Sequence, residues 1–170
     1  MDDLITLSSD VDDVQIVGID MDFDSIEQAI WNHHNCTDHY TYNHFTLKTA
    51  QRDAFDLDME NTFDIVVSNG LNIYIKNDEE VINLYKSFNK SLKSNGLLLT
   101  SHLTPITDQV FHDENFSKAS VILNDIIGVK WNNPRPVEMI VHQLDVAGFD
   151  ILTIEFDTDQ FYPTFLCKKR

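Results

Sequence analysis

Apolar and polar positions along the chain follow a pattern that predicts strands interspersed with helices. Runs rich in β-branched residues occur at positions 14–19, 45–49 and 63–67, and each has the length and composition of a strand. Residues 97–101 form a fourth predicted strand that begins with an apolar run, which is typical of a parallel strand covered on both faces. Four strands are therefore expected in the first 101 residues.

Helices are predicted where apolar residues recur at every third or fourth position. The first of them follows the first strand, and either Asp22 or Asp24 serves as its N-terminal cap. The clearest helix carries an amphipathic stripe over residues 80–92. Asn95 and Gly96 follow this stripe, and we expect them to supply the left-handed residue that closes the helix.

The C-terminal third of the chain continues the alternation. Helices are predicted at residues 115–127 and 137–147, and Gly148 ends the second of them. Two strands follow at residues 150–156 and 161–168, joined by a short polar connection that suits an antiparallel hairpin. Repeated strand and helix followed by a hairpin predicts a three-layer α/β domain with a mostly parallel sheet. In such sheets ligands bind beyond the carboxyl ends of the strands.

The length and composition fit one globular domain over residues 1–170. A chain of 170 residues, 42% of them hydrophobic, can bury a core that holds a fold without disulfides or metal. The two cysteines, Cys36 and Cys167, are far apart in the sequence and form neither a disulfide framework nor a zinc-binding pattern. They are compatible with a reducing cytoplasm.

The charge balance argues against several classes of partner. Acidic residues number 28 against 12 basic ones, for a net charge of -16, whereas nucleic acids and anionic membranes are bound by Lys and Arg. No stretch reaches the roughly 18 apolar residues that a membrane span needs. The N-terminal segment is acidic, unlike a secretory signal. We therefore expect a cytoplasmic protein that binds neither nucleic acid nor membrane.

Chemically useful residues gather where the predicted strands end. They are Asp20, Asp53 with Ala54 and Phe55, the tripeptide Ser68-Asn69-Gly70, and Ser101 with His102. An acid after an early strand can accept hydrogen bonds from both hydroxyls of a ribose, because its two oxygens are paired acceptors. An isolated Asp in this position can equally be a helix cap or a solvated turn residue. The order of these residues along the chain therefore carries more information than any one of them.

That order resembles the class I S-adenosylmethionine-dependent methyltransferases. The residues that carry the resemblance are Gly18-Ile-Asp20, Asp53-Ala54, Phe63-Asp-Ile-Val-Val-Ser-Asn-Gly70, Leu92-Lys-Ser-Asn-Gly-Leu-Leu-Leu99 and Ala147-Gly-Phe149. A bacterial stand-alone subgroup is similar through residues 68–74, residues 101–105 and Tyr162-Pro-Thr164. The resemblance covers essentially the whole chain. It implies a Rossmann-like methyltransferase sheet with S-adenosylmethionine as the cofactor.

The resemblance implies roles for individual residues. At the cofactor it places Asp20 by the ribose, Asp53 and Ala54 by the adenine, and Asn69 and Gly70 at the floor of the pocket. Met21 and Ser68, which adjoin these residues, are further candidates for binding the cofactor. Candidates for binding the methyl acceptor, a small molecule or a protein, are Tyr74, Arg135 and Tyr162, although each could equally pack or pair on the surface. His102 is a candidate general base because imidazole titrates near neutrality, but methyl transfer can proceed by alignment alone.

A histidine-rich segment offers an alternative site. It contains His33, His34, Cys36, His39 and His44, which are residue types that zinc accepts. Their spacing does not match the paired pattern of a structural zinc site, and a polar helix end with its loop explains them better. We therefore predict no metal.

The resemblance also implies a segment that these 170 residues do not contain. Methyltransferases of this class begin with a central strand and a glycine-rich loop that holds the methionine end of the cofactor, whereas the first of the five glycines here is Gly18. Without two or three such hydrogen bonds, which together contribute roughly 2 to 4 kcal/mol, affinity is expected to fall about 30- to 1,000-fold. Cofactor binding by these residues is then expected in the range of tens of micromolar to millimolar.

The absent strand has structural consequences. Its neighbours would be the strands that begin at Val14 and Phe63, so their facing edges would carry unpaired amides. Either those strands pair directly, or another chain fills the slot by self-association, or the fold is marginal. The same absence gives a second function class, a non-catalytic methyltransferase-like remnant or interaction module with weak or no cofactor binding. The acids retained at the strand ends favour the enzyme.

Overall fold

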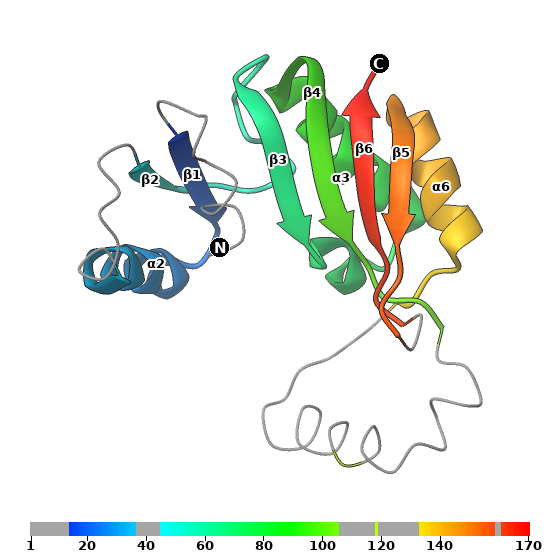
Figure 1. Cartoon of the computed structure of the whole chain (residues 1–170), viewed down its shortest axis with the longest axis horizontal. Helices are drawn as coiled ribbons and strands as arrows, with labels where there is room; N and C mark the ends of the chain where they lie inside the picture. The colour runs from blue at the N-terminus through cyan, green and yellow to red at the C-terminus, as the bar shows by residue number, and fades with distance from the viewer. Residues whose placement is uncertain (1–13, 37–44, 106–117, 119–132, 159–160) are drawn as a thin grey trace. The chain divides into compact units, whose positions relative to one another are not determined.

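The computed structural model describes residues 14–36, 45–105, 118, 133–158 and 161–170 (Figure 1). The chain divides into two compact units, an N-terminal unit of Met1–Leu57 and a C-terminal unit of Asp58–Arg170. Each unit has its own sheet, with two strands in the first and four in the second among the described residues. No helix in this part of the chain is both long and apolar enough to cross a membrane.

The N-terminal unit consists of a strand, a helix and a strand. β1 (Val14–Asp20) and β2 (Phe45–Gln51) pair in parallel, from Val14 opposite Phe45 to Asp20 opposite Gln51. α2 (Phe23–Cys36) packs against both strands and buries Ile26. The predicted strand, helix and strand are therefore confirmed, with β1 ending at Asp20 and β2 ending at Gln51, shortly before Asp53.

Asp22, rather than Asp24, caps α2. The Asp22 Oδ2 atom accepts hydrogen bonds from Ser25 N at 3.2 Å and from the Ser25 hydroxyl at 2.9 Å. The hydroxyl bond is the main cause of a lowered pKa of the Asp22 carboxyl. Both acids have the residue type of a cap, so only the geometry of the turn distinguishes them.

The C-terminal unit is built on a four-stranded sheet. Its elements in chain order are β3 (Phe63–Asn69), the 3-10 helix η3 (Leu71–Tyr74), α3 (Asp78–Ser91), β4 (Leu92–Ser101), α6 (Val137–Val146), β5 (Phe149–Glu155) and β6 (Thr164–Lys169). The strand order is β3-β4-β6-β5, with β3 parallel to β4 and β6 antiparallel to both β4 and β5. α3 and α6 both lie on one face of this sheet (Figure 1).

The core of the C-terminal unit lies between these two helices and the sheet. Its residues are at most 4% exposed and include Val81, Leu84, Tyr85 and Phe88 of α3, Ile140 and Leu144 of α6, and Leu98, Phe149, Phe165 and Cys167 of the strands. The apolar residues of α3 within the stripe predicted over residues 80–92 therefore form the buried face of this helix. Burial also raises the pKa of the Cys167 thiol to about 12.

Among the described residues, β4 is more deeply buried on one face than on the other. Leu98 and Thr100 are buried on the side of the helices, whereas Leu97 and Leu99, which alternate with them, are half-buried. On neighbouring β3, Ile65 pairs with Leu97 and is 51% exposed. An apolar run alone does not reveal that the described helices of this unit cover the same face.

The boundary between α3 and β4 differs from the prediction. β4 begins directly after the helix with Leu92, whose backbone is extended and which pairs with Phe63. The next paired residue of β4 is Leu97, so residues 93–96 form an irregularity in the strand. Asn95 does adopt the left-handed conformation, with a φ of 64°, but inside this irregularity. An Asn-Gly pair predicts a left-handed residue without showing which element contains it.

β6 begins at Thr164 rather than at residue 161. Pro163 has no amide hydrogen, and its carbonyl accepts a hydrogen bond from His102 N at 3.3 Å. The carbonyl of Phe161 likewise accepts from Thr104 N at 3.0 Å, so this segment runs beside the residues that follow β4. The antiparallel pairing of β5 with β6 confirms the predicted hairpin. The helix predicted at residues 115–127 lies outside the described residues, apart from residue 118.

β1 and β3 are end strands of their sheets. Among the described residues, β1 pairs only with β2, and β3 pairs only with β4. The alternation of strands and helices, together with the closing hairpin, agrees with the predicted α/β class.

Asn77 is expected to stabilise α3 as its N-terminal cap. The Asn77 side chain accepts a hydrogen bond from Glu79 N at 2.9 Å, and its backbone is extended. Asn77→Ala is expected to lower the free energy of unfolding by about 1 kcal/mol, measured by urea denaturation. Lys76→Ala, at the neighbouring exposed position, serves as the control and should change it by less than about 0.5 kcal/mol. Equal stability of the two variants would contradict the cap.

Candidate functional site

Four candidate residues lie together at the carboxyl edge of the N-terminal sheet. Asp20 ends β1, and its carbonyl accepts a hydrogen bond from Arg52 N at 3.0 Å. Asp53 and Ala54 come directly after Arg52, so this bond joins the ends of both strands. Met21 follows Asp20 and is 65% exposed. The residues predicted for the ribose and the adenine therefore share one edge of this unit.

The two acids at this edge are exposed, and each is held in its own turn. Asp20 Oδ1 accepts a hydrogen bond from Asp22 N, and Asp53 Oδ1 accepts one from Phe55 N, both at 2.9 Å. Such bonds set the direction of the side chain within the turn. An ionised carboxylate has about four acceptor positions, so one backbone bond leaves capacity for a ligand hydroxyl or amino group. A role of these two acids as turn residues is therefore compatible with a role in binding the cofactor.

A small cleft opens beside Asp20. It has a volume of about 130 Å³ and is lined by Gly18, Ile19, Asp20, Ser25, Ile26, Ala29 and Thr49, which come from β1, α2 and β2. Pockets that enclose a whole drug-sized ligand usually have about 300 Å³ or more. This cleft can therefore hold only part of a cofactor-sized molecule.

The second group of candidates lies at the carboxyl edge of the C-terminal sheet. Asn69 ends β3 and Ser101 ends β4, and the two residues are partners in register. The Ser101 hydroxyl donates to Asn69 Oδ1 at 2.6 Å. Tyr162 lies at the same edge, two residues before the antiparallel strand β6, because Thr164 pairs with Ser101. The ends of β3 and β4 and the segment before β6 therefore meet here.

Gly70 lies very close to the Tyr162 side chain at this edge. It caps η3 with a left-handed φ of 75°, and a Cβ atom there would lie 2.1 Å from the Tyr162 hydroxyl oxygen. Only glycine combines this backbone with so little space. Of its two predecessors, Ser68 is buried and Asn69 is exposed. The predicted floor residues thus form a tight turn with Asn69 at the surface.

The three acceptor candidates have different environments. Tyr74 is 59% exposed at the end of η3, and Tyr162 is half-buried against Gly70. Arg135 is only 4% exposed. Their role in binding an acceptor stays a prediction.

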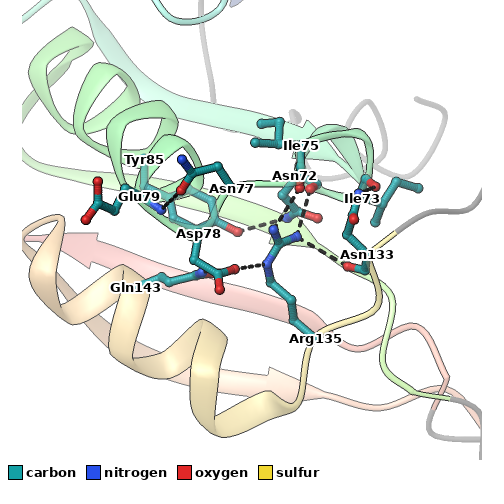
Figure 2. A network of polar contacts seen from close by, with 10 residues as sticks. All are labelled: Asn72, Ile73, Ile75, Asn77, Asp78, Glu79, Tyr85, Asn133, Arg135 and Gln143. Atoms are coloured by element: carbon teal, nitrogen blue, oxygen red, sulfur yellow. Dashed lines mark hydrogen bonds and ion pairs between the residues drawn. The ribbon is translucent and has the colours of Figure 1, made fainter.

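The guanidinium of Arg135 is already engaged by protein groups (Figure 2). Its Nε donates to Asp78 Oδ1 at 2.7 Å, its Nη1 to Asn72 O at 3.1 Å, and its Nη2 to Ile75 O at 2.7 Å. These bonds satisfy a charge that burial would otherwise penalise strongly. Arg135 therefore joins the start of α3 to the turn that follows Gly70.

Asn72 belongs to this network, although sequence reasoning did not identify it. Its side chain is buried, and its Nδ2 donates to the Tyr85 hydroxyl at 2.8 Å and to Ser101 O at 3.1 Å. An Asn in a turn is usually solvated, so the sequence contains no signal for this role. The bonds connect η3 to the end of β4 and to the core side of α3.

His102, the candidate general base, is buried. It is 1% exposed, and its ring packs on Phe165 with the ring centroids 4.9 Å apart. Neither ring nitrogen has a hydrogen-bond partner in the described structure. Burial, and to a lesser degree the charge of Arg135, lowers the pKa of His102 to about 4. The imidazole is therefore neutral at pH 7, and its catalytic role stays a prediction.

The described residues contain no group of three or more His, Cys, Asp or Glu side chains that could hold a metal ion. Of the histidine-rich segment, His33 and His34 lie in the last turn of α2, with their ring centroids 5.9 Å apart. His39 and His44 lie outside the described residues. The hypothesis of a zinc site gains no support from the part that is described.

Two comparisons place the chain among known proteins. The sequence profile of a methyltransferase domain matches residues 2–158. The solved structure of a Bordetella parapertussis protein, described as a possible exported protein, is 33% identical, with a TM-score of 0.76, over 92% of this chain and 53% of that one. The chain thus spans about half the length of that protein. No curated protein matches the chain.

More distant structures share the fold. A SAM-dependent methyltransferase from Methanosarcina mazei is 14% identical with a TM-score of 0.61, over 91% of this chain and 82% of that one. The magnesium protoporphyrin IX methyltransferase of Synechocystis, solved with bound SAH, is 16% identical with a TM-score of 0.62, over 92% of this chain and 65% of that one. With the profile match over most of its length, the chain belongs to the class I S-adenosylmethionine-dependent methyltransferase family.

Proposed function

We propose that this domain binds S-adenosylmethionine and serves its transfer of a methyl group to a small-molecule or protein nucleophile. Family membership supports the reaction class. One observation carries the cofactor assignment: in each unit, candidate residues gather at the carboxyl edge of parallel strands. Asp20 and Asp53 lie at one such edge, and Asn69 and Gly70 lie at the other.

The chemistry of these residues fits the cofactor. The Asp20 carboxylate would accept hydrogen bonds from the ribose hydroxyls, and Asp53 would accept one from the adenine amino group. Gly70 has no side chain, so its backbone can approach a ligand closely. The cofactor supplies an electrophilic methyl group on a sulfonium. The protein's part is to hold the acceptor in line with it, which needs alignment more than proton transfer.

A titration with S-adenosylhomocysteine, the product form of the cofactor, tests the proposal. Amide signals of ¹⁵N-labelled protein are expected to shift at the edge residues, Asp20, Asp53, Asn69 and Gly70. We expect a dissociation constant of tens of micromolar to millimolar, because these residues include no glycine-rich loop. Shifts confined to other parts of the chain would contradict the assigned site, and low-micromolar affinity would contradict the expected role of that loop.

Asp20→Ala is expected to weaken this binding at least about tenfold, the effect of losing hydrogen bonds to a charged acceptor. The measurement is the same titration. Asp24→Ala is the matched control, because Asp24 is also an exposed acid and lies on the first turn of α2. Equal affinities of the two variants would show that the ribose is not held by Asp20.

The second candidate is a non-catalytic interaction module. The small volume of the cleft beside Asp20, about 130 Å³, supports it, because this cleft can hold only part of a cofactor-sized molecule. A protein that is folded but shows no amide shifts up to millimolar S-adenosylhomocysteine would favour this candidate over the enzyme. Self-association through the end strands β1 and β3, and a cytoplasmic location, also stay predictions.

A further inference from the structure

The short helix η3 follows directly after the predicted floor of the cofactor site. It has four residues, and Gly70 is its N-terminal cap. Its local backbone bonds include Ile73 N to Gly70 O at 3.1 Å and Ile75 N to Asn72 O at 3.2 Å. A single 3-10 turn with so few bonds is not stable in isolation. Its conformation therefore depends on other parts of the unit.

Side chains from residues 133–135 hold the carbonyl groups of this turn (Figure 2). Arg135 donates to Asn72 O at 3.1 Å and to Ile75 O at 2.7 Å. Asn133 Nδ2 donates to Ile73 O at 3.1 Å. Carbonyls at the end of a short helix need such external donors. Two side chains thus donate to three carbonyls of the turn and its C-terminal cap, Ile75.

Arg135 is itself fixed from three directions. Its Nε donates to Asp78 Oδ1 at 2.7 Å, and Gln143 Nε2 of α6 donates to the same oxygen at 3.2 Å. The Arg135 backbone N donates to Leu103 O at 2.9 Å. A planar guanidinium held in this way presents its remaining donors in a set direction. The position of η3 is therefore tied to α3, α6 and the segment after β4.

Hydrogen bonds continue from the turn to the predicted site. Asn72 accepts from Arg135 through its carbonyl and donates through its side chain to Ser101 O at 3.1 Å. The Ser101 hydroxyl donates to Asn69 Oδ1 at 2.6 Å. Asn72 and Ser101 are 1% and 5% exposed, so water competes little for these bonds. A continuous set of bonds therefore connects Arg135 to Asn69.

We propose that Arg135 is a positioning residue of the cofactor site, which holds η3 so that Asn69 and Gly70 keep the conformation that binds the cofactor. This inference rests on the proposed function. It assigns Arg135 no contact with the cofactor or the acceptor. Arg135 acts through the carbonyls of Asn72 and Ile75.

Substitution of Arg135 tests the proposal with two readouts. Arg135→Gln is expected to weaken S-adenosylhomocysteine binding about tenfold. This is the effect of losing one hydrogen bond of ordinary strength between the displaced turn and the ligand. The amides of Ile73 and Ile75 are expected to exchange their hydrogens several-fold faster, because their bonds close the turn. Arg135→Lys keeps the charge but lacks the fork, so it should restore both properties only in part.

Leu144→Ala is the matched control. Leu144 is fully buried in α6, so its truncation lowers stability without removing a donor from the turn. It should leave S-adenosylhomocysteine affinity and the exchange of Ile73 and Ile75 unchanged under conditions where the variant is folded. The proposal is overturned if Arg135→Gln keeps wild-type affinity and exchange, or if Leu144→Ala reproduces both changes.

The exchange measurement separates this inference from the proposed function. If the wild-type protein binds no S-adenosylhomocysteine, the proposed function is overturned, and so is the claim that Arg135 supports cofactor binding. Exchange at Ile73 and Ile75 then decides alone whether Arg135 holds the turn. If Arg135→Gln does not fold, Arg135→Lys carries the same test: both changes are expected in reduced form, and wild-type affinity and exchange in this variant would overturn the proposal.

Discussion

Lowering the pH from about 7 to about 4 is expected to reduce the free energy of unfolding by about 3 kcal/mol through the buried ring of His102. A histidine in the unfolded chain binds a proton near pH 6.5, whereas burial lowers the pKa of His102 to about 4 in the folded protein. Between these values the unfolded state holds more protons. The contribution of the neutral His102 ring to the free energy of unfolding is therefore complete above about pH 6.5 and is lost as the pH falls toward about 4.

Urea unfolding at several pH values measures this loss. His102→Leu replaces the ring with an apolar side chain of similar volume, so the stability of this variant should fall less steeply between about pH 6.5 and 4. His142→Leu controls for the loss of a histidine, because His142 is exposed on α6, and it should keep the wild-type slope. A wild-type slope in His102→Leu would show that another group causes the acid sensitivity.

Gly70→Ala is expected to destabilise the C-terminal unit by about 2 to 4 kcal/mol and to weaken S-adenosylhomocysteine binding. Gly70 has a φ of 75°, a conformation that costs an alanine about 1 to 2 kcal/mol. The new Cβ would also lie 2.1 Å from the Tyr162 hydroxyl oxygen, so the tyrosine or the turn must move. Urea unfolding and the amide titration measure the two effects.

Two further variants separate the causes of this effect. Tyr162→Phe removes the clashing hydroxyl, so the double variant with Gly70→Ala should recover the packing loss and keep the backbone strain. Gly148→Ala is the control for backbone strain away from the predicted site, because Gly148 has a φ of 91° and its Cβ would meet only the Asn89 side chain, with Nδ2 at 3.2 Å. It should lose stability without losing affinity. Wild-type stability and affinity in Gly70→Ala would show that this turn does not need glycine.

The acids of the N-terminal unit could be predicted from the sequence, whereas the environment of Arg135 could not. Asp20 and Asp53 follow β-branched runs, and a parallel pair places both strand ends at one edge. Arg135 lies between two prolines, a context that is typical of an exposed loop. It is buried because carbonyls 63 and 60 residues away in the sequence accept its hydrogen bonds. Sequence spacing gives no information about such partners.

The boundaries of the helices and strands also include some that the sequence predicts and some that depend on distant residues. The β-branched density of residues 63–67 predicts β3 correctly, because that preference acts over a few neighbouring residues. The Asn95-Gly96 signal is also real, since Asn95 is left-handed. Its assignment to the end of α3 is wrong, because pairing of Leu92 with Phe63 draws the chain into β4 immediately after the helix. Strand pairing outweighs the local turn preference here.

By itself, the sequence determined the alternation of strands and helices, the acids at the strand ends, and the likeness to class I methyltransferases. These features depend on residues close together in the chain, where side-chain periodicity and backbone preference act. Only the tertiary structure decided that His102 is neutral and buried, that Arg135 holds a turn, and that Tyr162 closes over Gly70. Burial and hydrogen-bond partners come from distant segments, and they set the charge and the position of a polar group.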